Sequence, residues 1–249
     1  MKLENISPPT NEELIGGSGV SKQAARDWNI YIRNCYMRYE LVSHWINKYF
    51  EGKINGKKVL DWGCAIGGVA ILLQENMPLN MYCADVDKYS ISWLNKTNQS
   101  LKCSVLPYQP SIPYDDDFFD CIYGISVLTH LPIEQQEDYL SELRRIAMPG
   151  ALIILTVASD HVCVRNKDIA PNNPLYEKDT EKLHREGIIY HEYDKNTLNN
   201  LEFAKDKSYG LTFHSQKYIE EVFSRYFKMI ECIKGGLGDY QDVLILSKN

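Results

Sequence analysis

The sequence has no long apolar run and no start that resembles a secretion signal. Its longest strongly apolar stretch, residues 151–157, is far shorter than the roughly 20 residues that a membrane-spanning helix needs. Residues 1–14 contain no apolar core of the kind found in a signal peptide. We therefore expect a cytoplasmic chain without a membrane span.

Paired cysteines and basic blocks are missing as well. The 7 cysteines are odd in number, and no two of them are separated by two residues, so they predict reduced thiols and no zinc motif. Lys and Arg number 27 against 33 Asp and Glu, which gives a net charge of -6. A chain with this balance lacks the basic surface that binds a phosphate backbone, so we expect no nucleic acid partner.

The alternation of apolar and polar segments is typical of an α/β fold. Strands are predicted at 58–61, 80–85, 121–125 and 151–157, with helical patterns between them, and this order favours a mainly parallel sheet. Apolar residues at steps of three and four predict a long amphipathic helix over residues 21–50. After a helix at 215–226, strands at 228–233 and 243–247 are expected to close the sheet as a hairpin-like pair.

We predict one domain over residues 1–249. Residues 1–56 form an N-terminal arm and a helical cover, and residues 159–213 form an insert after the fifth strand. The insert has no clear period and contains Pro171 and Pro174, so it is expected to be a lid over the acceptor or a disordered segment.

A glycine turn follows the first strand and precedes a helix. The segment from Asp61 to Gly67 reads DWGCAIG, which does not match the G-x-G-x-x-G pattern of dinucleotide sites. Asp85 ends the second strand, where a carboxylate can accept two hydrogen bonds from a ribose diol. Turn and acid together predict a ligand that contains adenosine. The alternative is a glycine turn without a ligand and a helix cap at Asp85 or Asp87.

At this glycine turn the chain resembles the class I S-adenosylmethionine-dependent methyltransferases, with Ala65 in place of the usual middle glycine. The likeness continues through IPYDDDFFD (112–120) and ELRRIAMPG (142–150). A narrower likeness to a bacterial subgroup, similar to enzymes of polysaccharide and capsule biosynthesis, is carried by SVLTHL (126–131), TFHS (212–215) and QD (241–242). The resemblance implies a doubly wound, seven-stranded Rossmann-like sheet and S-adenosylmethionine as cofactor.

The resemblance also implies roles for single residues. The residues expected at the cofactor are Asp61, Gly63, Cys64, Ala65, Gly67, Asp85, Val86, Gln109, Pro110 and Ser126. The expected reaction is O-methylation of a sugar or glycan-linked hydroxyl. Such a hydroxyl needs a base, for which His130 comes first and His214 second, with His161 and Asp160 behind them.

Other interpretations remain open at this point. The acceptor could be another small molecule, with a phosphate-type oxygen or an amine, or the chain could be a catalytically silent binding module. The tetrad at 126–129 is not the Asn-Pro-Pro-Tyr type, which disfavours methylation of amino groups on bases or glutamine. No cluster of His, Asp and Glu has the spacing of a metal site, so no metal is predicted.

Overall fold

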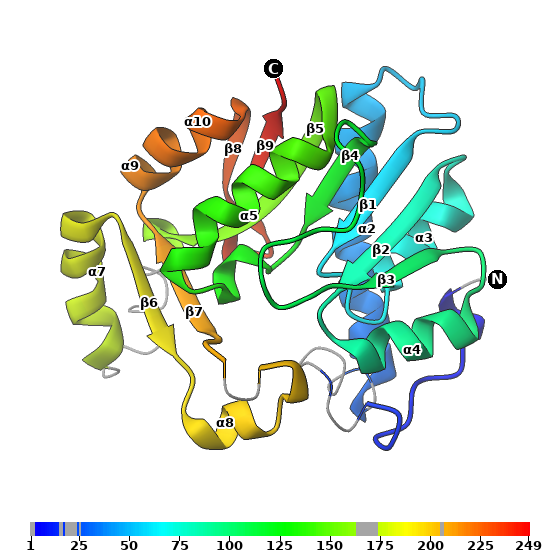
Figure 1. Cartoon of the computed structure of the whole chain (residues 1–249), viewed down its shortest axis with the longest axis horizontal. Coiled ribbons are helices and arrows are strands. Elements are labelled where there is room, and N and C mark those ends of the chain that lie inside the picture. The colour runs from blue at the N-terminus through cyan, green and yellow to red at the C-terminus, as the bar shows by residue number, and fades with distance from the viewer. Residues whose placement is uncertain (1–2, 15–16, 18–23, 25, 163–173, 205–206) are drawn as a thin grey trace.

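The computed structural model describes residues 3–14, 17, 24, 26–162, 174–204 and 207–249, and a central β-sheet with helices on both faces dominates it (Figure 1). Most of the glycine stretch at 16–19 lies outside the described residues. So do residues 163–173 and 205–206 of the predicted insert.

Five parallel strands form the centre of the sheet in the order β3-β2-β1-β4-β5. They are β1 (Lys58–Trp62), β2 (Asn80–Asp85), β3 (Lys102–Val105), β4 (Phe119–Gly124) and β5 (Ala147–Ser159). β9 (Gln241–Ser247) pairs antiparallel with β5, and β8 (Lys228–Leu237) pairs antiparallel with β9. The mainly parallel α/β fold and the closing hairpin are confirmed.

The sheet is larger than predicted, with nine strands instead of seven. The additional pair is the antiparallel hairpin of β6 (Ile188–Glu192) and β7 (Gly210–His214), both inside the predicted insert. β5 is 13 residues long, so its last two residues extend past β9 and pair with β7. The insert is therefore partly regular, and its short strands escaped the search for a period because each is only five residues long.

Helices cover both faces of the sheet, and α8 (Lys195–Asn199) lies beyond its carboxyl edge (Figure 1). The other helices are α2 (Trp28–Tyr49), α3 (Gly68–Asn76), α4 (Lys88–Thr97), α5 (Ile133–Ile146), α7 (Pro174–Glu186), α9 (Gln216–Tyr218) and α10 (Ser224–Tyr226). Short 3-10 turns are η1 (Leu3–Asn5), η2 (Leu128–His130) and η3 (Glu202–Ala204), and η4 (Ile219–Phe223) is a π-helical turn. The predicted helix at 215–226 is thus one helical segment with a π turn in its middle.

Alternating side chains of each strand face the two layers. Val59 and Met81 pack with α2 and α3, whereas Leu60 and Tyr82 pack in the cluster that contains α5. In Figure 1, α5 passes in front of the sheet and α2 lies behind it. Both faces are covered, as a parallel sheet requires.

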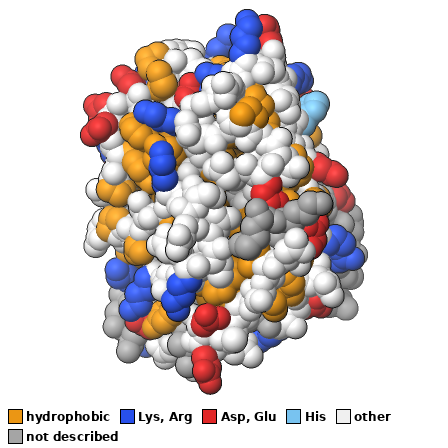
Figure 2. Space-filling view, turned by 90° about the vertical axis from the view of Figure 1, so that its right-hand side faces the viewer, with side chains coloured by type: hydrophobic (Ala, Val, Ile, Leu, Met, Phe, Trp, Pro, Cys, Tyr) orange, Lys and Arg blue, Asp and Glu red, His pale blue; other side chains and the backbone are white. Residues whose placement is uncertain are grey.

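The surface is charged and the described helices are amphipathic or short. Acidic and basic side chains are mixed on the face that Figure 2 shows. Within the described parts of the chain, no helix combines the length and apolar character that crossing a membrane requires.

Because β1, β2, β4 and β5 run parallel, their carboxyl ends meet at one edge of the sheet. In folds of this kind, ligands bind in the crevice beyond that edge. The glycine turn after β1, Asp85 at the end of β2 and Ser126 after β4 all lie there.

Candidate functional site

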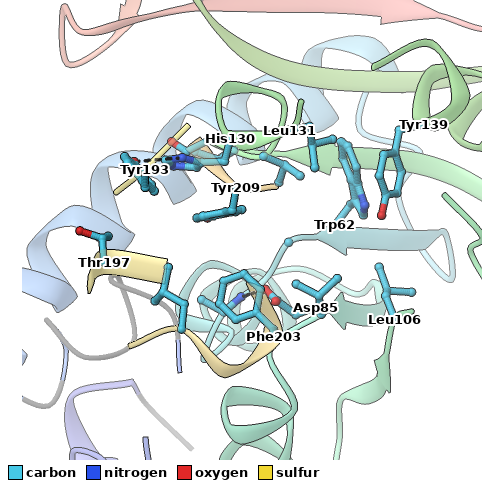
Figure 3. Close-up of a pocket in the computed structure, with 17 residues that line it drawn as sticks. Trp62, Asp85, Leu106, His130, Leu131, Tyr139, Tyr193, Thr197, Phe203 and Tyr209 are labelled. Carbon is cyan, nitrogen blue, oxygen red and sulfur yellow. Dashed lines mark hydrogen bonds between the residues drawn. The ribbon is translucent and has the colours of Figure 1, made fainter. Parts of the chain in front are cut away.

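A cavity of about 440 Å³ opens at the carboxyl edge of the sheet. Asp85 and Phe203 lie on its lower side in Figure 3, and His130, Tyr193 and Tyr209 lie together above them. Trp62 and Tyr139 lie on the opposite wall, at the right of the view. The cavity therefore joins the sheet edge to residues of the predicted insert.

Glycine at position 63 allows the side chain of Val127 to approach the backbone after β1. Gly63 has a φ of +75°, and a Cβ at this position would lie only 2.3 Å from a methyl carbon of Val127. Ala65 has a φ of +48°, a region that L residues rarely adopt, which explains why glycine is usual at this position of the motif. Both residues line the main cavity.

Asp85 connects the glycine turn to the start of α4. Its Oδ2 accepts from the backbone N–H of Ala65 at 2.7 Å, and its Oδ1 accepts from that of Asp87 at 2.8 Å. Burial raises the pKa of the Asp85 carboxyl to about 6, against the lowering effect of these two bonds. Each carboxylate oxygen has a further lone pair, so the group can also accept hydrogen bonds from a ligand in the cavity.

A second cavity, of about 70 Å³, lies behind the glycine turn. Asp61, Arg38 and Tyr31 line it, together with Cys64 and Ser126. The hydroxyl of Tyr31 accepts from the backbone N–H of Gly68 at 3.0 Å, which ties α2 to the first turn of α3. Burial raises the pKa of Asp61 to about 7, whereas Tyr123 beside it and the charge of Arg38 act in the opposite direction.

The tautomer of His130 follows from its neighbours. Nδ1 lies 2.8 Å from the carbonyl oxygen of Gly210, and since a carbonyl only accepts, Nδ1 carries the proton and donates. The hydroxyl of Tyr193 lies 3.4 Å from the same nitrogen. The lone pair is then on Nε2. Burial lowers the pKa of His130, so the ring is neutral near pH 7.

Aromatic rings from the insert complete the wall around His130. The ring of Tyr209 stacks on that of His130, with 5.1 Å between centroids and 19° between planes. Phe203 meets Tyr209 edge to face at 5.2 Å. Tyr209, Tyr193 and Phe203 are separated from His130 by more than 60 residues in the sequence, and the β6–β7 hairpin with η3 brings them together.

The predicted site residues divide into three groups. Gly63, Ala65, Asp85, Val86, Ser126 and His130 line the main cavity, and Asp61 and Cys64 line the small one. Gly67 lines neither cavity and is the N-cap of α3, with a φ of +70°. Gln109 and Pro110 also line neither cavity, and Leu106 stands at the main one instead.

The structure does not bring His214 to either cavity. The side chain is fully buried, and its Nε2 lies 3.1 Å from Oε1 of Gln136. Burial lowers its pKa to about 3, so the ring is a neutral part of the core. His161 and Asp160 are also absent from both linings, and His161 Nε2 pairs with Asp239 at 2.9 Å.

Two residues of α2 that line the small cavity were not predicted from the sequence. Tyr31 and Arg38 are seven residues apart and, with Cys35 between them, they share one helical face. That spacing was available as a signal, but only the packing of α2 on α3 shows that the face meets the glycine turn. Among the described residues, no group of three or more His, Cys, Asp or Glu side chains is placed to hold a metal ion.

Comparison with known proteins adds a family match and several similar folds. A family model described as a methyltransferase domain matches residues 34–226. Phosphoethanolamine N-methyltransferase 3 of Arabidopsis thaliana is 29% identical over 126 residues, which are 49% of this chain and 24% of that protein. The chain spans less than half the length of each of the curated relatives that it matches.

Two solved structures illustrate the similarity of fold. The 1,6-didemethyltoxoflavin-N1-methyltransferase of Burkholderia thailandensis gives a TM-score of 0.58 at 12% identity, over 91% of this chain and 84% of that one. The magnesium protoporphyrin IX methyltransferase of Synechocystis PCC 6803 gives 0.57 at 16% identity, over 88% and 85%. At these identities the likeness concerns the fold alone.

Proposed function

The chain belongs to the methyltransferase domain family, and we propose that it transfers a methyl group from S-adenosylmethionine to a hydroxyl group of a small, neutral acceptor. The observation that carries this proposal is the bond from His130 Nδ1 to the Gly210 carbonyl. This bond fixes the proton on Nδ1 and leaves the lone pair on Nε2, burial keeps the imidazole neutral, and the residue lines the cavity at the sheet edge.

The described residues fit the proposed cofactor at both of its ends. Asp85 would accept hydrogen bonds from the ribose hydroxyls, with Val86 on the adenine side, and Gly63 and Ala65 line the same cavity. In the small cavity, Arg38 would pair with the carboxylate of the amino-acid end and Asp61 with its ammonium group. When bound, the cofactor supplies a methyl group that is already activated by a positively charged sulfur.

His130 acts as the base. A hydroxyl is a poor nucleophile at neutral pH, and it reacts faster when a nearby group takes its proton. Nε2 of the neutral ring accepts that proton, and the Gly210 carbonyl and the stacked Tyr209 ring hold the imidazole in place. The resulting imidazolium is stabilised by its bond to the Gly210 carbonyl. Positioning of the cofactor and the acceptor contributes the remaining rate enhancement.

The lining of the main cavity selects a neutral acceptor. Among its described lining residues, Asp85 is the only carboxylate and there is no Lys or Arg. An acceptor with a phosphate or diphosphate would bury its negative charge without a partner, which is costly. A sugar or glycan-linked hydroxyl remains our first acceptor class, because Tyr193 and Tyr209 offer ring faces and the sequence resembles the polysaccharide subgroup. A phenolic hydroxyl is the second, because most of the remaining lining is apolar.

We further propose that residues 1–249 work as one unit. The hydroxyl of Tyr36 on α2 bonds to Glu4 of the arm, and Lys88 of α4 pairs with Glu202 of the insert at 2.6 Å. In limited proteolysis of the folded protein, we expect the arm and the insert to stay attached. Release of either segment without loss of cofactor binding would contradict it.

The proposal is tested by a transfer assay with S-adenosylmethionine labelled in the methyl group. The panel contains a methyl glycoside, a simple phenol, a primary amine and a nucleotide sugar. We expect label on the oxygen of a neutral hydroxyl acceptor, identified as a methyl ether by mass spectrometry. Label found on the amine or on a phosphate oxygen instead would contradict the proposal, and cofactor binding without transfer to any acceptor would favour a silent module.

A further inference from the structure

A closed set of hydrogen bonds joins the end of β4 to β5 and β9. Nε2 of Gln241 donates to Oγ of Ser126 at 2.9 Å, and Oε1 of Gln241 accepts from Oγ1 of Thr156 at 2.6 Å. Oγ1 of Thr156 accepts in turn from the backbone N–H of Ser126 at 2.7 Å. Thr156 is fully buried and Gln241 is 9% exposed, so water competes little for these bonds.

The residue that these bonds hold has an unusual backbone. Ser126 has a φ of +60°, in the left-handed region that favours glycine. It lines both the main cavity and the small cavity behind the glycine turn. Its neighbour Val127 lies directly against Gly63, so the conformation of this loop also sets how closely β4 approaches the turn.

We propose that Gln241 and Thr156 are positioning residues for the amino-acid end of the cofactor. Neither side chain is among the described lining residues of these two cavities, so both act through Ser126, which they hold in a conformation that it would rarely adopt alone. The small cavity, with Arg38 and Asp61, is thereby formed before the ligand arrives. This inference rests on the proposed cofactor but does not depend on the proposed acceptor.

The test compares two ligands that differ in the amino-acid end. S-adenosylhomocysteine has it, and 5′-methylthioadenosine lacks it. In calorimetry on the full chain, Thr156→Val and Gln241→Leu should each weaken binding of S-adenosylhomocysteine by about ten- to a hundred-fold. Binding of 5′-methylthioadenosine should change less than about three-fold, because the adenosine half is held by Asp85.

Conservative variants separate positioning from general loosening. Thr156→Ser keeps the hydroxyl and should restore most of the affinity, whereas Thr156→Val has nearly the same shape without it. Ser247→Ala, at the opposite end of β9, is the control and should bind both ligands as the unchanged protein does. Positions 156 and 241 supply independent variants. A variant at either position that keeps the far-ultraviolet circular dichroism spectrum of the unchanged protein is sufficient to test the positioning role.

Two results would overturn the positioning role. One is an equal loss of affinity for both ligands, which would indicate a purely structural effect. The other is unchanged affinity for S-adenosylhomocysteine in the folded variants. Failure of the unchanged protein to bind S-adenosylhomocysteine would instead contradict the proposed cofactor itself, and the positioning role with it.

Discussion

The two halves of the main cavity are built in different ways. The half at the sheet edge consists of a backbone turn at Gly63 and a buried carboxylate at Asp85, which hydrogen bonds to the backbone hold in place. The opposite half consists of His130, the stacked ring of Tyr209 and the tilted ring of Tyr193, and Phe203 meets Tyr209 edge to face from the side of Asp85 (Figure 3). A backbone cradle can fit one ligand closely and keep that fit. Where side chains of an inserted hairpin form the wall, a few substitutions can change which ligand the cavity binds.

This difference suggests a division of labour. We propose that the sheet edge binds the cofactor, and that His130 and the inserted hairpin bind the acceptor. The predictions below test this division by changing one group at a time and measuring which property of the protein changes.

The largest effect is expected on the acceptor side. His130→Ala removes the proposed base and should lower turnover by about a hundred- to ten-thousand-fold, while cofactor affinity stays nearly unchanged. His44→Ala, on the exposed face of α2, serves as the matched control. Near-normal turnover of His130→Ala with an identified acceptor would show that His130 is not the base.

The next effect is expected on the cofactor side. Asp85→Ala removes the acceptor of the ribose hydrogen bonds, and a loss of about 1.5 to 3 kcal/mol should weaken cofactor binding roughly ten- to a hundred-fold. Calorimetry with S-adenosylhomocysteine measures this, with Asp115→Ala in the exposed turn as the control. Unchanged affinity in Asp85→Ala would refute its assignment to the ribose.

The pH dependence of cofactor binding should follow the raised pKa of Asp85. The ribose hydroxyls donate to the ionised carboxylate, so affinity is full above the pKa of about 6 and is lost as the pH falls through it. Between pH 8 and pH 5 this group alone should weaken binding about ten-fold. Asp85→Asn should reduce the dependence below pH 6. An identical pH profile in the variant would contradict the assignment.

The smallest effect is expected at the contact between the insert and α4. Lys88 and Glu202 are half-exposed, so water screens their ion pair and it contributes little to stability. Glu202→Gln should therefore raise hydrogen exchange in residues 195–204 by less than about five-fold and leave β5 unchanged. In the unchanged protein, residues 195–204 should exchange faster than β5. Equal protection of these two segments, with and without ligands, would contradict this difference in mobility.

The sequence signals of the cofactor half are local, and the structure brings Gly63 and Asp85 to one cavity. The turn at Gly63 and the acid at Asp85 each follow a strand within a span of about 25 residues, and the alternation of strands and helices orders the sheet. The substitution at Ala65 was also visible, but its φ of +48° and its bond to Asp85 were not.

The acceptor half could not be derived in the same way because it depends on packing between distant segments. His214 lies in the TFHS motif that suggested a site, yet successive residues of a strand face opposite sides. The side that His214 takes is set by the pairing of β7 with β5 and β6, through Ser159 and Ile188. Gln109 and Pro110 were placed by analogy, and the loop before them brings Leu106 to the cavity instead.

The most direct test of the central claim is a crystal structure of the protein with S-adenosylhomocysteine. We expect the ribose at Asp85, the amino-acid end in the small cavity beside Arg38 and Asp61, and the sulfur facing the wall of His130 and Tyr209. A ligand bound elsewhere, or with its ribose away from Asp85 and its sulfur away from His130, would contradict the assignment of the two halves.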